Sequence, residues 1–181
     1  KNIENNNVIG LPTETVYGLA GNAYSNISVK KIFKLKKRPP SNPLIIHFKN
    51  LTNLKKDAIC NNYFIKLYKV LCPGPITFVL NKNPKSKISK MANAGKQTIA
   101  VRIPRHKVAK KLLKMLNVPL AAPSANISSK LSPTCAKDVV DEFGNKIKFI
   151  LDGGRCKIGL ESTIVDLTNK PTILRQGIIT T

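Results

Sequence analysis

The feature that most constrains this chain is a short apolar run, Val8–Leu11, followed at once by Pro12 and a polar cluster, Thr13–Thr15. The run is typical of a buried strand, and Pro12 ends its hydrogen-bond ladder because proline lacks a backbone N–H. The oxygens of the cluster are suited to cap a following helix. Because α/β folds bind ligands beyond strand ends, the pattern predicts a strand, a polar turn and a helix beside a ligand. A capped turn without a ligand explains the same residues.

Length and composition favour one domain over residues 1–181, because a 42% hydrophobic chain of this size can bury one core. No apolar run approaches the roughly 20 residues that a membrane span needs, and the polar start lacks the apolar core of a signal peptide. The four cysteines are too widely spaced for a zinc knuckle or a redox pair, and we interpret them as reduced core residues. These features predict a cytoplasmic protein without a membrane segment.

The net charge is +22, from 31 basic and 9 acidic residues. A positive field of this kind attracts polyanions such as nucleotides or RNA. The excess is mostly lysine in a chain also rich in asparagine, so a bias of the coding sequence explains it as well. The few arginines are therefore more informative, since arginine suits bidentate contacts with phosphate and carboxylate.

The order of elements predicts one mixed sheet with flanking helices. Val29, Ile32, Phe33 and Lys36 lie at helical spacing after a Ser28 cap, and the helix ends before two prolines. Further helices are predicted in 51–71 (two), at 108–116 and from a Thr134 cap to 143, and strands at 43–48, 76–80, 98–104, 119–122, 149–152, 162–166 and 172–175. We therefore predict an α/β (α+β) fold, a single domain whose mixed, twisted sheet surrounds a central ligand cleft. The Lys-rich connection 81–97 is a candidate lid.

Side chains suited to chemistry recur where these strands end, and one cleft would bring them together. They are Thr13, His47, Arg102, Ser124, Ser162 and Arg175. Arg102 lies in an apolar strand and needs an anionic partner, from the protein or from a ligand. The scarcity of carboxylates favours a bound anion. Taken alone, His47 and the turn at 124–126 are explained equally well by local hydrogen bonding. No phosphate-binding glycine motif, catalytic triad or metal-ligand spacing is present.

The stretch PTETVYGL at 12–19 resembles the signature of the YrdC/Sua5 family, the threonylcarbamoyl-AMP synthases of tRNA modification. Further islands of that family follow in order over nearly the whole chain. They are KxR before proline at 36–39, the PL-hydrophobic-His strand ending at 47, PGPxT at 73–77, AVRxPxH at 100–106, PLAAPSANxS at 119–128, SPT at 132–134, LDGG at 151–154, GLESTxVD at 159–166 and LRxG at 174–177.

The resemblance implies a set of site residues. The residues implied to be catalytic and to bind ATP are Lys36, Arg38, Ser124 and Asn126, with Arg175 as a further ATP contact. The residues implied to bind threonine are Thr13, Tyr17, His47, Arg102 and Ser162, with Arg102 as the carboxylate partner. Mg²⁺ is expected to accompany ATP, and its ligands stay unassigned.

The implied enzyme is a nucleotidyltransferase that converts L-threonine, bicarbonate and ATP into threonylcarbamoyl-AMP and pyrophosphate. A separate transferase complex would then modify adenosine 37 of tRNA, so a tRNA contact is also possible. The carbamate formed from threonine and bicarbonate would attack the α-phosphorus, a displacement that needs alignment and charge neutralisation. Because a carbamate is unstable in water, a closed cavity is expected.

Two departures from the family pattern concern turns near the implied site. Gln176 replaces the usual proline beside Arg175, and Ser129 replaces a frequent glycine. GLESTIVD resembles the longer Sua5 type, whose extra C-terminal domain does not follow before Thr181, and the sequence leaves open whether the chain is a compact form or a piece. An alternative of another class is a non-catalytic module of the same fold that binds double-stranded RNA or tRNA. A third is a paralogue that has lost the reaction, against which the intact motifs argue.

Overall fold

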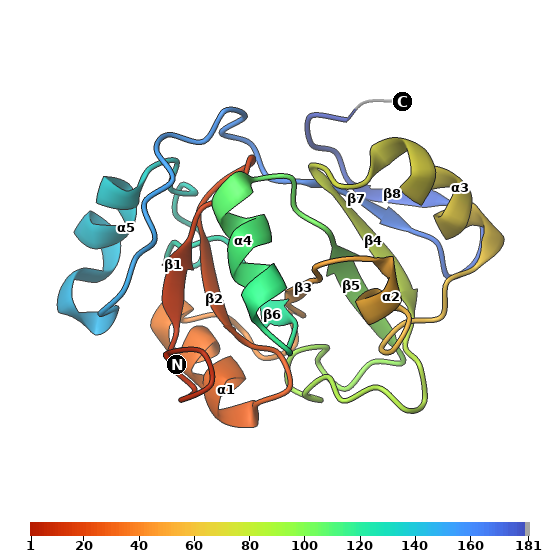
Figure 1. Ribbon diagram of the computed structural model, residues 1–181, viewed down its shortest axis with the longest axis horizontal. Helices are drawn as coiled ribbons and strands as arrows, with labels where there is room; N and C mark the ends of the chain where they lie inside the picture. Colours follow the sequence, from red (N-terminus) through yellow and green to blue (C-terminus); the bar gives the residue numbers. More distant parts are fainter. Residues whose placement is uncertain (180–181) are drawn as a thin grey trace.

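The computed structural model describes residues 1–179. Eight strands form one sheet in the order β1–β2–β6–β3–β5–β4–β7–β8 (Figure 1). The strands are β1 (Ile9–Leu11), β2 (Gly18–Asn22), β3 (Ile45–His47), β4 (Ile76–Asn81), β5 (Thr98–Arg102), β6 (Leu120–Ala121), β7 (Thr163–Asp166) and β8 (Thr172–Arg175). The helices are α1 (Asn26–Lys36), α2 (Leu51–Leu54), α3 (Asn62–Leu71), α4 (Lys107–Met115) and α5 (Ala136–Phe143), with a 3₁₀ turn at Gly144–Lys146.

The sheet is mixed, as predicted: β3 pairs in parallel with β5 and β4 with β7, whereas the other neighbours are antiparallel. The register of the β3–β5 pair sets Ile45 opposite Ala100 and His47 opposite Arg102. Because facing residues of neighbouring strands point to the same side of a sheet, His47 and Arg102 are held next to each other. The backbone pairing therefore brings two candidate site residues together.

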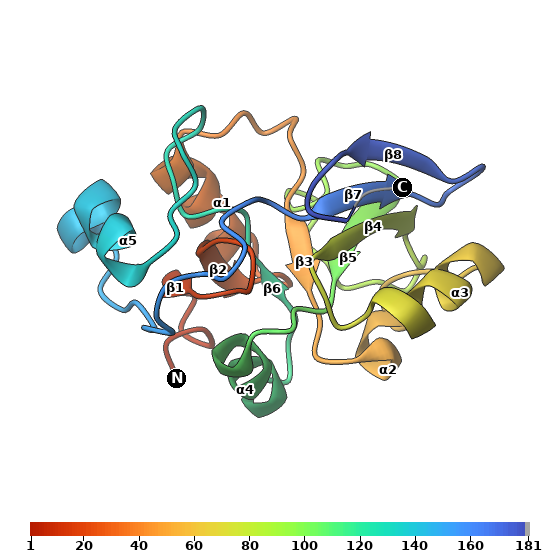
Figure 2. The ribbon, with the colours of Figure 1, turned by 90° about the horizontal axis from the view of Figure 1, so that it is seen from above.

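The helices cover both faces of the sheet, with α1 on one side and α2, α3 and α4 on the other (Figure 2). On α1, Val29, Ile32 and Phe33 are buried in the main core, as their helical spacing predicts. On α4, Ala109 and Leu113 belong to a second cluster with residues of β1 and β6. The sheet lies between the two apolar clusters, and their close packing holds the ends of its strands in place.

The helix predicted directly after Thr13–Thr15 is wrong, because that turn leads into strand β2. The Thr13 hydroxyl is used within its own turn, where it donates to the Val16 carbonyl at 2.6 Å and accepts from the Thr15 N–H at 3.2 Å. The backbone of β2 is satisfied by β1 on one side and β6 on the other. Strand pairing on both sides thus outweighs the local capping signal.

Two predicted caps are shifted and one predicted strand is reduced to a bridge. The N-cap of α1 is Ser25, whose hydroxyl accepts from the Ser28 N–H, and that of α5 is Cys135 rather than Thr134. Segment 149–152 makes only a parallel bridge between Ile150 and Gly10. It follows the edge strand β1 too briefly to form a regular ladder.

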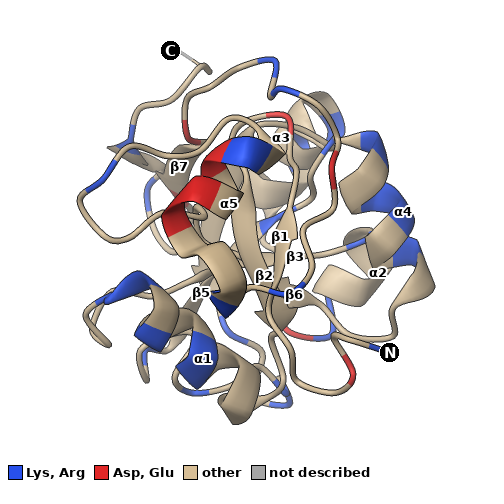
Figure 3. Cartoon of the chain, turned by 90° about the vertical axis from the view of Figure 1, so that its left-hand side faces the viewer, with Lys and Arg blue, Asp and Glu red and all other residues tan. Residues whose placement is uncertain are grey.

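Acidic side chains gather on α5, which carries Asp138, Asp141 and Glu142, whereas lysines and arginines are spread over most other elements (Figure 3). All helices within residues 1–179 are too short or too polar to cross a bilayer. The four cysteines are free thiols. Cys156 is buried in the main core, and Cys60 and Cys72 are partly buried against it, as predicted. The prediction of a core residue is wrong for Cys135, the N-cap of α5.

Candidate functional site

A narrow cleft of about 60 Å³ lies at the strand ends. Its lining includes all six side chains that the sequence predicts to meet, and Arg38 joins them. These residues are Thr13, Arg38, His47, Arg102, Ser124, Ser162 and Arg175. The prediction that one sheet gathers these groups around a cleft is therefore confirmed, whereas their roles stay predictions.

Arg102 finds its anionic partner within the protein. Its guanidinium donates to Glu14 Oε1 at 2.7 Å, to the Thr15 hydroxyl at 2.9 Å and to the Gly74 carbonyl at 3.3 Å. Both side chains of the ion pair are buried. The predicted anionic partner of Arg102 is thus present within the protein, and a bound anion as a further partner stays a prediction. Only three of the five N–H groups of the guanidinium are used, so two are left for a ligand.

Glu14 fixes the geometry around Arg102 by accepting hydrogen bonds with both carboxylate oxygens. Oε2 accepts from the backbone N–H of Arg105 at 3.0 Å and of His106 at 3.2 Å. Burial raises the pKa of Glu14, but the charge and hydrogen bonds of Arg102 outweigh it and hold that pKa below its ordinary value. Glu14 is therefore ionised and clamps the start of α4 to the opening turn.

His47 is a neutral imidazole at physiological pH. Burial, and then the charge of Arg102, lower the pKa of His47 to about 3. Its Nδ1 is buried without a hydrogen-bond partner among the described residues. An unpartnered buried nitrogen is costly, so a ligand group that pairs with it gains stability.

Two further arginines, Arg38 and Arg175, line the same cleft. Arg38 donates to the Asn42 side chain at 2.6 Å and to the Pro43 carbonyl at 2.9 Å. Arg175 forms an ion pair with Glu161 and donates to the Ser162 carbonyl at 2.9 Å. Burial lowers the pKa of both arginines, but an arginine still stays charged. This pair of arginines makes the cleft cationic, because Glu161 is the one carboxylate that offsets their two guanidinium groups.

Two hydroxyl groups complete the cleft. Ser162 lies 2.8 Å from the Thr77 hydroxyl on β4 and also accepts from Arg175 at 3.3 Å. Ser124 follows β6, and its N-terminal neighbour Pro123 packs in the same wall. These hydroxyls can donate to or accept from a ligand because their protons rotate.

Lys36 and Asn126 are buried and do not line the cleft. The ammonium of Lys36 donates to the backbone carbonyls of Ser124 and Asn126, the latter at 2.6 Å, and to Asn126 Oδ1 at 3.3 Å. Burial, and then the charge of Arg38, lower the pKa of Lys36 to about 8. These three acceptors use all three donors of the ammonium, so Lys36 ties α1 to the 124–126 turn.

Tyr17 also lies outside the cleft. Its fully buried hydroxyl donates to the Gly154 carbonyl at 2.8 Å and accepts from the Gly153 N–H at 3.0 Å. Burial raises the pKa of Tyr17, so the phenol stays protonated. The LDGG loop thus takes the hydroxyl of Tyr17, and its role in threonine binding stays a prediction.

The segment 81–97 does not cover the cleft. Its residues Ile88 and Ala92 are buried in the core, and the Ala92 carbonyl accepts from the Leu44 N–H at 2.7 Å. No residue of this segment lines the cleft. The lid prediction is therefore wrong for this structure, because two apolar side chains anchor a segment that its overall composition marks as a loop.

Sequence reasoning left Glu14 and Glu161 without a role. Both are near the cleft and each is paired with an arginine. The sequence contains one indication of a role for them: carboxylates are scarce in this chain, so a carboxylate within a family motif is a candidate partner of a nearby cation. Within residues 1–179, no group of three or more His, Cys, Asp or Glu side chains is placed to hold a metal ion.

A wider groove of about 710 Å³ lies next to the cleft and is lined by residues 125, 126 and 129–134 and by two carboxylates, Asp138 and Glu142. The Ser132 hydroxyl donates to Glu161 at 2.9 Å, which links the groove to the cleft. Three guanidinium groups, a neutral imidazole and hydroxyls at strand ends are the groups of an α/β fold that suit an anionic small molecule.

The comparison with known families agrees with that class. The Sua5_yciO_yrdC family model, described as "Telomere recombination", matches residues 1–177, and the chain belongs to this family. The chain is 46% identical to the threonylcarbamoyl-AMP synthase of Pyrococcus abyssi over 180 residues, which cover 97% of this chain and 52% of the relative. It is 40% identical to the enzyme of the same name from Schizosaccharomyces pombe, covering 93% of this chain and 47% of that one.

A solved structure shares the whole described fold. The crystal structure of P. abyssi Sua5 complexed with L-threonine superimposes with a TM-score of 0.93 at 44% identity, covering 97% of this chain and 51–52% of the Sua5 chains. The chain thus spans about half the length of the curated relatives it matches.

Proposed function

We propose that this chain is the catalytic domain of a threonylcarbamoyl-AMP synthase, which converts L-threonine, bicarbonate and ATP into threonylcarbamoyl-AMP and pyrophosphate. The observation that carries the proposal is the single cleft shared by Arg38, Arg102, Ser124 and Arg175. The names of the relatives support the same reaction, and one relative was solved with L-threonine. The product would serve N6-threonylcarbamoyladenosine formation at position 37 of tRNA, in the cytoplasm, through a separate transferase complex.

The narrow end of the cleft is suited to threonine. The two unused N–H groups of Arg102 would hold the carboxylate, and the unpartnered Nδ1 of His47 would pair with the amine or hydroxyl. Ser162, held by Thr77 and by Arg175, would provide a further hydroxyl to the substrate. Thr13 shapes the wall through its turn rather than through a free hydroxyl.

The other end is suited to the nucleotide. Arg38 and Arg175 would offset the charge of the phosphates, and the groove beside Asn126 offers room for the nucleoside. Both carboxylates near the cleft are already paired with arginines, so the side chains do not form a metal site of their own. We therefore propose that Mg²⁺ enters as part of the Mg-ATP substrate, on the phosphates. Lys36 acts as a positioning residue that holds the turn bearing Ser124.

The reaction needs two bond-forming steps. The amine of threonine adds to the carbon of bicarbonate, water leaves, and a carbamate results. A carbamate oxygen then attacks the α-phosphorus and pyrophosphate departs with the electron pair of the broken P–O bond. The protein contributes alignment and fixed positive charge, which is most effective where water is excluded.

The test is threonine-dependent release of pyrophosphate from Mg-ATP and bicarbonate. Arg175→Ala removes a fixed cation, and we expect it to lower the rate about 100-fold or more, the usual effect of losing one charge-stabilising group. Lys55→Ala, an exposed lysine outside the cleft, is the matched control and should keep full activity. Circular dichroism checks that both variants fold. Absence of threonine-dependent pyrophosphate, together with tight double-stranded RNA or tRNA binding, would favour the non-catalytic module instead.

A further inference from the structure

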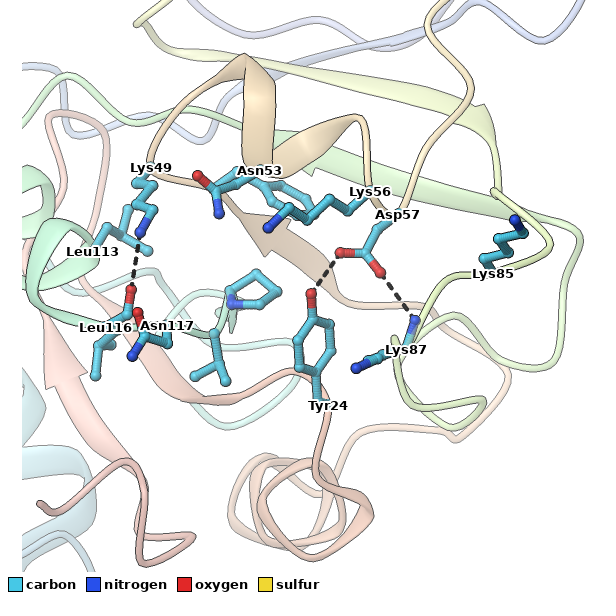
Figure 4. A pocket seen from close by; sticks show the side chains of 13 residues that line it. Tyr24, Lys49, Asn53, Lys56, Asp57, Lys85, Lys87, Leu113, Leu116 and Asn117 are labelled. Carbon is cyan, nitrogen blue, oxygen red and sulfur yellow. Dashed lines mark hydrogen bonds between the residues drawn. The ribbon is translucent and has the colours of Figure 1, made fainter.

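A second hollow, of about 200 Å³, shares no lining residue with the cleft. It lies where the ends of β3 and β6 meet α2, α4 and the segment 81–97 (Figure 4). Separate stretches of the chain contribute to its wall, among them Lys49, Asn53, Lys87 and Asn117. A hollow assembled from so many segments is a feature of the tertiary fold and not of one surface helix.

The charge of this hollow is strongly positive. Lys49, Lys56, Lys85 and Lys87 line it, and Asp57 is the one acidic residue among the lining residues. None of these four ammonium groups forms an ion pair with any residue of the described chain. The one hydrogen bond recorded for them is that of Lys49 with the Leu116 carbonyl at 3.4 Å. Lys49 is partly buried and the other three lysines are exposed. Because like charges near one another repel, an anion between them lowers the energy.

Asp57 offsets only one of these four charges and forms no ion pair with them, because neutral donors surround its carboxylate. It is buried and accepts from the Tyr24 hydroxyl at 2.8 Å, from the Ser86 hydroxyl at 2.8 Å and from the Lys87 backbone N–H at 3.0 Å. Burial, with the hydrogen bond to Asp57, raises the pKa of Tyr24, so that this phenol stays protonated as a donor. Asp57 therefore anchors the 81–97 segment as a wall of the hollow.

The remaining lining combines free donors with an apolar floor. The side-chain amides of the partly buried Asn53 and the exposed Asn117 make no hydrogen bond to other described residues. Phe48, Leu113 and Pro119 are buried parts of the same lining. Figure 4 shows Lys56 extending over the centre of the hollow, whereas Lys85 points away from it. Ammonium and amide N–H donors around a recess are the groups that bind oxyanions.

We propose that this hollow binds a phosphate-bearing anion. Lysine binds phosphate as a point charge, and a multivalent anion neutralises several lysines at once, which a single carboxylate does not. The volume suits a phosphate or pyrophosphate group. A free phosphate compound and a backbone phosphate of RNA share this chemistry. General lysine enrichment does not explain the site, because the lysines come from separate segments and surround unpartnered amides.

The experiment titrates ¹⁵N-labelled protein with pyrophosphate at low salt and follows amide resonances. We expect saturable shifts of the side-chain amides of Asn53 and Asn117. The double variant Lys49→Gln/Lys56→Gln should weaken this binding about tenfold or more, because hydrogen bonds to charged groups are lost. The control Lys55→Gln/Lys66→Gln changes the net charge equally at exposed lysines outside the hollow and should leave the affinity within about twofold.

Equal weakening by the two double variants would reduce the effect to bulk charge and overturn the proposal. Shifts confined to cleft residues such as Ser124, or no saturation at all, would overturn it as well. Parallel titrations with AMP and a single-stranded RNA octamer identify the source of the phosphate: tighter binding of the RNA, weakened by the hollow variant, indicates a backbone phosphate. Binding is measured without catalysis, so the result is independent of the proposed synthase reaction.

Discussion

Removing the charge of Glu14 is the most direct test of how the cleft is built. Glu14→Gln keeps the size of the side chain and one oxygen to accept from the Arg105 or His106 N–H. It leaves the guanidinium of Arg102 buried with no carboxylate beside it. The variant therefore isolates the ion pair rather than the packing.

The expected loss of stability in Glu14→Gln follows from the burial of the ion pair. The two side chains are only 5% and 10% exposed, so solvent screens their attraction little. Removing one partner of a buried ion pair costs about 3 to 5 kcal/mol, and the retained hydrogen bonds place Glu14→Gln near the lower value. For a chain of this length, about 3 kcal/mol corresponds to a fall in Tm of roughly 6 to 12 °C.

The assay is urea unfolding followed by circular dichroism, with Arg102→Gln and the double variant completing a cycle. We expect the double variant to be about 2 kcal/mol more stable than the sum of the single effects predicts. Because the pKa of Glu14 is lowered in the folded protein, the stability it contributes is present above the ordinary pKa of 4.5 and is lost as pH falls through the folded value. The gap between wild type and Glu14→Gln should therefore narrow in acid. A variant within about 0.5 kcal/mol of wild type at neutral pH would refute this reasoning.

Three further changes test the positioning network. Lys36→Met leaves the carbonyls of the 124–126 turn unpartnered and should lower the free energy of unfolding by about 2 to 4 kcal/mol, measured in urea. Tyr17→Phe should cost about 1 to 2 kcal/mol of stability but leave the KM for threonine unchanged, since the phenol lies outside the cleft; a large rise in KM would contradict that position. In Gly177→Ala the new Cβ would lie 2.5 Å from the Glu161 carbonyl oxygen, so the strand carrying the last arginine must shift; an unchanged Tm would argue against this contact.

Local sequence patterns predicted the elements that depend on neighbouring residues. The period of Val29, Ile32 and Phe33 identified α1, and apolar runs identified most strands. The prediction failed after Thr13, where a strand paired on both sides replaced the expected helix. It failed for 81–97 because buried Ile88 anchors a segment whose remaining composition is typical of a mobile loop. In both places long-range contacts outweigh local propensity.

The sequence by itself determined which chemical groups the protein has: arginines at strand ends, a Ser-Asn turn and a family signature along the whole chain. The tertiary structure alone decided which of them face a ligand. It paired Arg102 with Glu14, committed Lys36 and Tyr17 to backbone carbonyls and placed Glu161 beside Arg175. The physical reason is that a buried polar group must find a partner, and that partner comes from a distant part of the chain, whose position is set by sheet register and packing.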